Sequence, residues 1–201
     1  MRIVAGLYRG RPIEAPQGEA TRPTTDRVRE AMMSALSSLR GGFDGAIVLD
    51  AFAGSGALGI EALSRGARAA QFFERDRKAY QTLKRNLSKL NIEGTRARAL
   101  NADVTTSRQL CMDQPFDLVF FDPPYAQSAE DVLGFALRAR DAGKIGEDAI
   151  IVYEHALSNA ADVEKSAQEK GFEVLVSKKY GKTGVTMMQV ATDDRGSDDD
   201  E

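Results

Sequence analysis

From residue 46 onward the chain repeats one unit: a short apolar strand, a turn and an amphipathic helix. This alternation predicts an open, mostly parallel sheet with helices on both faces, because parallel neighbours need a crossover connection. The last two expected strands are joined only by the glycine-containing loop 180–184, so one strand should run antiparallel to the rest. The prediction is an α/β fold with seven strands, at 46–51, 69–74, 97–101, 116–121, 149–153, 172–179 and 185–191. Expected helices are 57–65, 77–90, 105–110, 129–140 and 160–170.

The chain before residue 46 has a different pattern. Residues 2–7 and 11–13 flank a glycine-containing turn and predict a short β-hairpin, which is too small for its own core and should lean on the main domain. A helix is expected over 26–39, capped by Thr24 or Thr25. Its predicted apolar face consists of Val28, Met32, Ala35, Leu36 and Leu39.

Asp50 ends the first sheet strand and is followed by the bend Ala51-Phe52-Ala53-Gly54-Ser55-Gly56. Open α/β sheets bind ligands at the carboxyl ends of their strands, and glycines let backbone N–H groups approach a ligand closely. Gly54, Gly56 and Gly59 match the dinucleotide pattern G-x-G-x-x-G, although Gly59 could serve only close helix packing. An acid directly after the strand repels a pyrophosphate and suits a cation. The bend therefore favours a ligand with an amino-acid part over a nicotinamide dinucleotide.

Two more acids follow the next two strands. At the end of the second strand, the Glu74 carboxylate can accept both hydroxyls of a ribose; the alternative is a solvated acid beside two arginines. Asp103 follows the third strand, where it can accept from an adenine amino group while Val104 packs on the ring. It can equally be the N-cap of the 105–110 helix. With Asp50 and Asp122, four consecutive strands each bring an acid to one edge, which indicates a nucleoside that carries an amine.

The stretch Asp122-Pro123-Pro124-Tyr125 follows the buried strand 116–121. Proline has no N–H, so the turn leaves carbonyl oxygens free to accept, and the residue before a proline is held extended. Tyr125 can lie flat over a planar ring. Two acceptors and an aromatic platform suit the exocyclic amine of a nucleobase.

Composition narrows the class of protein. No apolar run approaches the roughly 20 residues of a membrane span, the N-terminus lacks a signal peptide's apolar core, and the single Cys111 suits a reducing cytoplasm. Cys111 is expected to be half-buried, and His155, the sole histidine, lacks neighbours for a metal site. The residues from 193 to 201 hold six acids and one arginine and are expected to be disordered.

Arginines are concentrated at the start of the chain, with seven in the first forty residues against four acids. That excess suggests a phosphate-bearing partner, although a solvated surface is the alternative. The candidates for phosphate contacts are Arg2, Arg9, Arg11, Arg22 and Arg27. The stretch Arg22-Pro23-Thr24 could instead line a ligand pocket.

Taken together, the Asp50 bend, the strand-end Glu74, Asn101-Ala102-Asp103 and Asp122-Pro-Pro-Tyr125 resemble the S-adenosylmethionine site of class I methyltransferases, which have a Rossmann-like fold. The N-terminal stretches Arg2-Ile-Val-Ala-Gly6, Gly10-Arg11 and Thr21–Glu30 resemble the RsmD family of bacterial 16S ribosomal RNA guanine-N2 methyltransferases. The resemblance runs from Met1 to about Ala191. It implies a cytoplasmic enzyme, expected to be a monomer, that acts on 16S rRNA in the assembled small ribosomal subunit without a metal.

The resemblance also implies a role for each site residue. Asp122, Pro123, Pro124 and Tyr125 hold the target base, while Asp50 and the bend hold the methionine part of S-adenosyl-L-methionine. Glu74 then takes the ribose and Asp103 the adenine. The implied cofactor site consists of Asp50, Phe52, Gly54, Ser55, Gly56, Glu74, Arg75, Ala102, Asp103 and Val104. The expected organisation is an RNA-binding hairpin extension (1–20), a methyltransferase domain (21–192) and the tail (193–201).

Three other functions stay open at this point. Asp-Pro-Pro-Tyr serves adenine N6 equally well, so an amino-methyltransferase acting on DNA or another RNA is an alternative. A non-catalytic RNA-binding module that kept the fold and an NAD-dependent reductase are further alternatives.

Overall fold

The computed structural model describes residues 1–15, 26–92, 94–107, 109–124 and 126–191. A seven-stranded sheet in the order β3-β2-β1-β4-β5-β7-β6 runs through the protein. All neighbouring strands from β3 to β5 are parallel, and only β7 runs antiparallel to its neighbours, as predicted. The strands are β1 (Ile47–Asp50), β2 (Ala69–Phe73), β3 (Ala97–Leu100), β4 (Phe116–Phe121), β5 (Ile145–Ala156), β6 (Phe172–Tyr180) and β7 (Thr183–Val190).

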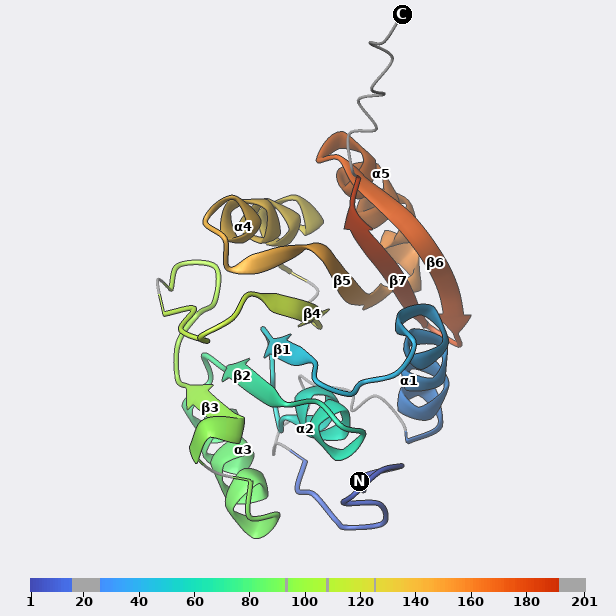
Figure 1. The fold of residues 1–201 in the computed structure, drawn as a ribbon. Coiled ribbons are helices and arrows are strands. Elements are labelled where there is room, and N and C mark those ends of the chain that lie inside the picture. Colours follow the sequence, from blue (N-terminus) through green and yellow to red (C-terminus); the bar gives the residue numbers. More distant parts are fainter. Residues whose placement is uncertain (16–25, 93, 108, 125, 192–201) are drawn as a thin grey trace, which may run out of the picture.

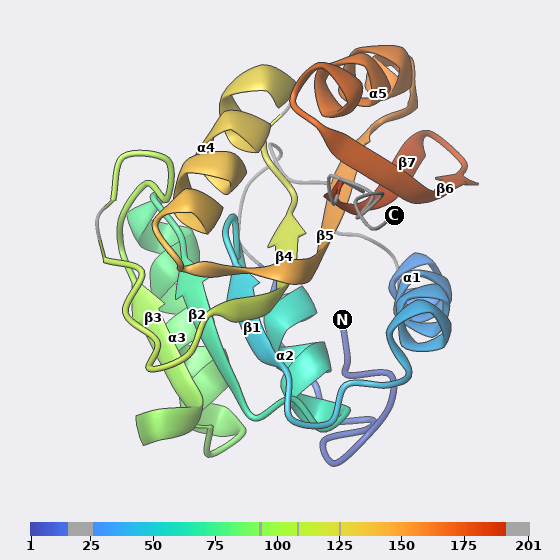
Figure 2. The same ribbon diagram turned by 45° about the horizontal axis from the view of Figure 1, so that its top comes forward.

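Helices cover both faces of the sheet, as Figures 1 and 2 show. One face packs against α1, α2 and α3, and the other against α4 and α5, so each face has its own hydrophobic core. The helices are α1 (Asp26–Arg40), α2 (Ala57–Ser64), α3 (Arg77–Lys89), α4 (Ala129–Asp141) and α5 (Ala160–Glu169), with 3-10 turns η1 (Gly94–Arg96) and η2 (Leu157–Asn159). In the described part of the chain, no helix is long and apolar enough to cross a membrane.

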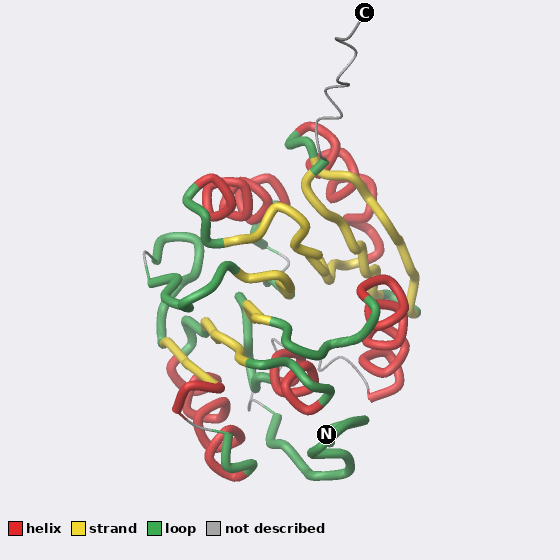
Figure 3. Tube along the Cα trace, in the orientation of Figure 1, coloured by secondary structure: helices red, strands yellow, loops and turns green. Residues whose placement is uncertain are grey.

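The described residues between β3 and β4, 101–107 and 109–115, form a loop instead of the expected helix at 105–110. Turns span Val104–Thr106 and no helix follows in the described residues, as the tube of Figure 3 shows. The reason lies in Gln71 on β2, a fully buried side chain. Its amide donates to the Gln109 carbonyl (2.5 Å) and accepts from the Cys111 N–H (3.1 Å). The loop backbone thus finds its partners in a side chain of the sheet instead of in a helix.

The N-terminal arm, residues 1–15, is a hairpin in outline only. A single bridge joins Arg2 to Pro12, whereas strands were predicted. The amides of Val4 and Ala5 donate to the Glu61 carboxylate of α2 (2.9 and 3.0 Å), and the Leu7 amide donates to the Ser64 carbonyl (2.7 Å). Because α2 takes these donors, the arm packs on the helix instead of completing its own ladder.

Helix α1 buries most of its predicted apolar face, including Met32 and Leu36 with Ala35 packed against the core, but two details differ from the prediction. Met32, Met33 and Leu36 are fully buried, but so is Arg29, while Leu39 is 38% exposed. The Arg29 guanidinium forms ion pairs with Asp26 (2.8 Å) and Glu61 (3.7 Å), which compensate its burial. Its partner Glu61 lies on another helix, so the apolar pattern of α1 alone gives no sign of this contact.

The predicted boundaries of the other elements hold to within a few residues, except for β5. That strand extends from Ile145 to Ala156 instead of over 149–153, because Ile145 pairs with Phe116 of β4 across a register shift and the residues from 154 to 156 pair with β7. The predicted core faces of α3 (Ala79, Leu83, Leu87 and Leu90) and the methionines Met187 and Met188 are buried as expected.

Candidate active site

Four acids follow four adjacent parallel strands, as predicted. Asp50 of β1 is in register with Phe72 of β2 and Phe120 of β4, and Phe73 of β2 is in register with Leu100 of β3. Asp50, Glu74, Asp103 and Asp122 therefore all lie at the carboxyl edge of the sheet. This is the edge at which open α/β sheets bind ligands.

The bend after β1 is shaped by two glycines with positive φ, Gly54 (54°) and Gly56 (83°). A Cβ on Gly56 would lie 2.4 Å from Leu83 of α3, whereas a Cβ on Gly54 would meet nothing within 4 Å. A side chain at position 56 would clash with Leu83, so packing requires Gly56. At position 54 it is the positive φ that favours glycine, and the space beside Gly54 is open. At Gly59 a Cβ would lie 2.4 Å from the Phe72 ring, so its role as a packing glycine is confirmed. Phe52 lies partly buried, edge-on to Phe121, with ring centroids 6.2 Å apart.

Asp50 is 2% exposed, and its Oδ2 accepts from the Gly59 N–H in the first turn of α2 (2.9 Å). Burial raises the pKa of Asp50 to about 7, the Gly59 hydrogen bond opposes that rise, and the nearby charge of Glu74 adds to it. The carboxyl is therefore poised between its neutral and charged forms near neutral pH. A cation beside it would favour the charged form.

Glu74 connects the bend to the start of α3. Its Oε2 accepts from the Gly54 N–H (2.8 Å) and its Oε1 from the Asp76 N–H (2.7 Å). Asn101 donates to the carbonyls of Glu74 (2.8 Å) and Arg75 (3.1 Å), which holds this turn from the β3 side. Each carboxylate oxygen has a second lone pair, so Glu74 can still accept from hydroxyls.

Asp103 is partly exposed and organises the turn that follows β3. Its Oδ1 accepts from the N–H (2.9 Å) and hydroxyl (2.7 Å) of Thr105, and its Oδ2 lies 3.5 Å from the Arg75 guanidinium. Although partial burial opposes it, these contacts together lower the pKa of Asp103, so the group is an anion at neutral pH. Ala102 is half-buried beside it, and Val104 is 1% exposed, within the core under α4. The predicted N-cap role is replaced by a turn, because no helix follows in the described residues 104–107 and 109–115.

Asp122 follows β4 directly, with Pro123 buried and Pro124 exposed behind it. Solvent reaches the Asp122 side chain, although protein atoms surround it on most sides. This burial, together with repulsion from the carboxylates of Glu154 and Asp50, raises the pKa of Asp122 well above its usual range. Tyr125 lies outside the described residues. The Asp122 carboxyl can thus act as a hydrogen-bond acceptor with an enhanced affinity for a proton.

Sequence reasoning missed the fifth acid of this edge, Glu154 on β5. Phe121 and Tyr153 are in register, so Glu154, within β5, lies at the level of Asp122, which directly follows β4. Glu154 is only 9% exposed. Burial, and then the charge of Asp122, raises the pKa of Tyr153. The signal that could have found Glu154 is its position at the end of the strand after Asp122.

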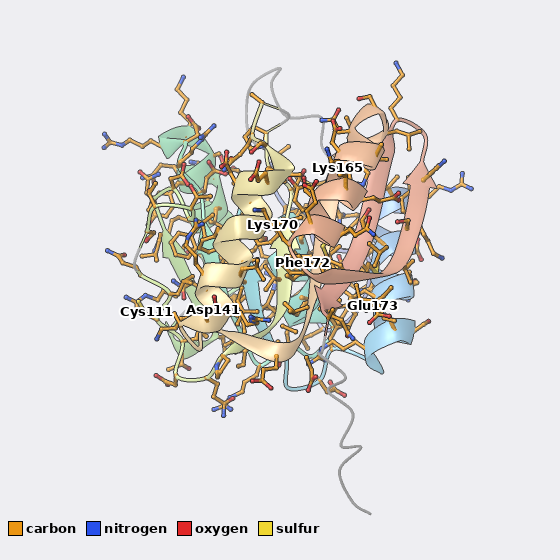
Figure 4. The ribbon with its side chains drawn as sticks, turned by 90° about the horizontal axis from the view of Figure 1, so that it is seen from above. Cys111, Asp141, Lys165, Lys170, Phe172 and Glu173 are labelled. Atoms are coloured by element: carbon orange, nitrogen blue, oxygen red, sulfur yellow. The ribbon has the colours of Figure 1, made fainter. Side chains whose placement is uncertain are left out.

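A cavity of about 400 Å³ adjoins this corner on the α5 side. Pro123 and Pro124 form part of its wall, and Lys165, which Figure 4 shows on α5, lines it as well. Its lining carries four carboxylates, those of Glu130, Glu154, Asp162 and Glu169. Such a charge disfavours a phosphate there.

The candidate arginines lie along the arm and at the start of α1. Arg2 is 3.6 Å from Asp26 at the start of α1, the helix that contains Arg27. Arg11 lies close to Arg2, because the Ile3 amide donates to the Arg11 carbonyl (3.0 Å), and the Arg11 guanidinium donates to the Lys89 carbonyl at the end of α3 (2.6 Å). Arg9 lies in the turn of the arm, which contacts the end of α2. Because α2 ends where β2 is about to begin, this turn lies at the opposite edge of the sheet from Asp122. Arg22 lies outside the described residues.

The surroundings of His155 and Cys111 give neither residue a part in the candidate site. The His155 ring is buried between the Ala156 carbonyl (2.9 Å) and the Thr186 hydroxyl (3.1 Å), close against Gly184. Among the described residues, no three or more His, Cys, Asp or Glu side chains could hold a metal ion together. Cys111 is exposed rather than half-buried and lies at the margin of the molecule in Figure 4, because its loop is held at Gln71 and not by a helix.

The sheet order and the helices on its two faces define the class I methyltransferase fold. A solved structure described as "Putative methyltransferase yhhF from Escherichia coli" superposes with a TM-score of 0.75 at 31% identity, covering 95% of this chain and 98% of that one. The family model "Conserved hypothetical protein 95" matches residues 1–189, and the chain belongs to this family.

Two named relatives agree with that assignment. "Putative rRNA methyltransferase YlbH" of Bacillus subtilis is 35% identical over 190 residues, covering 93% of this chain and 97% of the relative. "Ribosomal RNA small subunit methyltransferase D" of Escherichia coli (strain K12) is 37% identical over 160 residues, covering 79% and 76%. The resemblance to the RsmD family is thereby confirmed.

Proposed function

We propose that this protein transfers a methyl group from S-adenosyl-L-methionine to the exocyclic N2 of a guanine in 16S ribosomal RNA, within the assembled small subunit. The observation that carries the proposal is the row of carboxylates at the ends of β1, β2, β3 and β4, beside a glycine bend and a diproline corner. The relatives named as ribosomal RNA methyltransferases support the substrate class.

The residues at the bend fit the methyl donor. Open space beside Gly54 leaves room for a ligand against the backbone, and Asp50 offers a negative charge for an ammonium group. Glu74 retains lone pairs for the ribose hydroxyls, and Asp103 is an anion that can accept from the adenine amino group. When bound, the donor supplies a methyl group activated by the positive charge on its sulfur.

At the acceptor side, Asp122 and the Pro123 carbonyl accept the two N–H bonds of the guanine amine. The amine lone pair is delocalised into the ring, and two acceptors favour the pyramidal nitrogen whose lone pair is free to attack. As the C–N bond forms and the C–S bond breaks, the nitrogen becomes cationic and loses a proton. The raised pKa of Asp122 lets its carboxylate take that proton and pass it to water. Positioning provides most of the remaining rate, and Tyr125 is proposed to stack on the base.

The candidate arginines would contact RNA phosphates along the arm and the start of α1. Arg2 and Arg27 lie by the start of α1, and Arg11 lies close to Arg2, because the Ile3 amide donates to the Arg11 carbonyl (3.0 Å). Arg9 lies farther along, in the turn that packs on the end of α2. Arginines spread along the arm suit an extended stretch of phosphates, which agrees with a substrate as large as a ribosomal subunit.

The decisive experiment incubates the purified protein with the labelled donor and small subunits from cells lacking this protein. We expect label in 16S RNA, and nuclease digestion should release it as N2-methylguanine. Release as N6-methyladenine would favour the amino-methyltransferase acting on adenine. Unlabelled subunits that still bind the protein would favour a non-catalytic RNA-binding module.

Donor binding should depend on pH through Asp50. Because the folded pKa is raised to about 7, the carboxyl is largely neutral below pH 7 and charged above it. An ammonium group binds the charged form, so donor affinity at pH 6 should be about tenfold lower than at pH 8. Calorimetric titration at both values measures this. In Asp50→Asn, the affinity should be low and nearly independent of pH; an unchanged pH dependence would contradict the role of Asp50.

A further inference from the structure

Asn86 on α3 is the only residue among those described whose side chain bonds both the N-terminal arm and the glycine bend. Its side chain is fully buried next to the core leucines Leu83 and Leu87. A buried amide is costly unless its donors and acceptor are all bonded. The hydrogen-bond partners of Asn86 therefore identify the segments that its amide holds together.

All three bonds go to backbone groups. The Nδ2 group donates to the carbonyl of Ser55 (2.9 Å) and to the carbonyl of Glu14 (3.0 Å), while Oδ1 accepts from the Glu14 N–H (2.8 Å). The two bonds to Glu14 involve both its backbone N–H and its carbonyl, as in the pairing of two β-strands. Through Ser55, the Asn86 amide contacts the middle of the bend between the two glycines.

The other backbone contacts of the bend come from the strands beside β1. Ala51 donates to the Phe120 carbonyl of β4 (3.1 Å), Ala53 donates to the Phe73 carbonyl of β2 (2.8 Å), and Gly54 donates to the Glu74 carboxylate in the turn after β2 (2.8 Å). Ser55 is 5% exposed, so its carbonyl has little water to replace a lost partner. The Asn86 bond thus fixes the α3 side of the bend.

The Glu14 side chain adds a second attachment that does not involve the bend. Its carboxylate lies 3.0 Å from Arg85 and 3.2 Å from Lys89, one on each side of Asn86. These three groups are exposed, so their ion pairs contribute little to stability. The backbone pairing with Asn86 is the buried part of the attachment.

We propose that Asn86 is a positioning residue that couples docking of the N-terminal arm to binding of the methyl donor at the bend. This inference rests on the proposed function, in that the bend is taken to hold the donor. With the arm docked, the amide is oriented by Glu14 and holds the Ser55 carbonyl. When the arm leaves, two of its three bonds are lost and the bend is less restrained. By reciprocity, a bound donor should hold the arm in place.

The test compares Asn86→Asp with wild type. An aspartate has the same shape but donates no hydrogen bond, and it faces the carbonyls of Ser55 and Glu14 with negative charge. We expect donor binding about tenfold or more weaker, within the usual range for coupled sites. Gln81→Glu makes the same chemical change at an exposed site of α3 and should leave the affinity unchanged.

A second variant tests the bond between Asn86 and Glu14 by changing the arm. Glu14→Pro removes the N–H that Oδ1 accepts but leaves Asn86 and Ser55 intact, whereas Glu14→Ala removes only the exposed ion pairs. We expect weaker donor binding in Glu14→Pro, near-normal binding in Glu14→Ala, and non-additive losses in Asn86→Asp/Glu14→Pro. Hydrogen exchange should show that the donor protects arm amides in wild type and not in Asn86→Asp.

The outcomes separate this inference from the proposed function. If wild type binds the donor and both Asn86→Asp and Glu14→Pro bind it equally well, the coupling is wrong and the enzyme assignment stands. Additive losses, or protection of the arm that persists in Asn86→Asp, would also overturn the coupling. If wild type binds no donor, the proposed function fails first.

Discussion

Replacing Asp122 with asparagine should reduce methyl transfer by about a thousandfold or more, in the range expected for loss of a residue that accepts the transferred proton. The asparagine keeps one oxygen acceptor near the guanine amine but cannot take up a proton. It also removes the charge that Glu154 and Asp50 repel, so the folded protein should not be less stable. Single-turnover rates with saturating donor and small subunits measure the loss of the chemical step.

Donor affinity shows whether Asp122 accepts the proton from the target base or instead contacts the methyl donor. Asp122 lies at the end of β4, one strand away from the bend after β1, so Asp122→Asn should bind the donor within about threefold of wild type. Asp148→Asn, at the exposed start of β5, makes the same change at the far edge of the sheet and should leave both quantities unaltered. A large loss of donor affinity in Asp122→Asn would show that its carboxyl serves the donor instead.

The sequence predicts this edge of the sheet well because the relevant residues follow strands directly. Asp50, Glu74, Asp103 and Asp122 each come at or just after the end of an apolar run, and parallel strands bring such positions together whatever the helices between them do. Glu154 directly follows the predicted strand 149–153, so the same signal is present there, but in the structure β5 continues through Glu154 to Ala156. A strand paired on both sides tolerates polar ends that a propensity argument treats as loop.

The errors elsewhere share one physical origin, a polar side chain that bonds to the backbone of a distant segment. Gln71 bonds the backbone of the loop where a helix was predicted at 105–110. Glu61 accepts two amides of the arm that a hairpin ladder would otherwise use. Asn86 does the same for Glu14. In each case the partners lie dozens of residues apart, and local periodicity carries no information about such bonds.

The buried carboxylate of Glu61 should have the largest effect on stability. It accepts from the amides of Val4 and Ala5, bonds the Arg65 guanidinium (2.9 Å) and faces the fully buried Arg29 (3.7 Å). The Arg29 Nε has no hydrogen-bond partner among the described residues, so the charge of Glu61 is what compensates it there. Glu61→Gln keeps the shape but leaves a buried cation with one fewer counter-charge, and its cost should be about 3 to 5 kcal/mol.

Urea unfolding of Glu61→Gln, Glu30→Gln and Arg29→Met/Glu61→Gln tests this account. Glu30 is exposed on α1, so Glu30→Gln should change the free energy of unfolding by no more than about 0.5 kcal/mol. Removing the Arg29 charge as well should recover part of the loss, because the buried cation no longer needs a partner. Equal stability of Glu61→Gln and wild type would mean that water or Asp26 compensates Arg29. Since the same carboxylate binds the arm, Glu61→Gln should also expose residues 3–8 to proteases before the core unfolds.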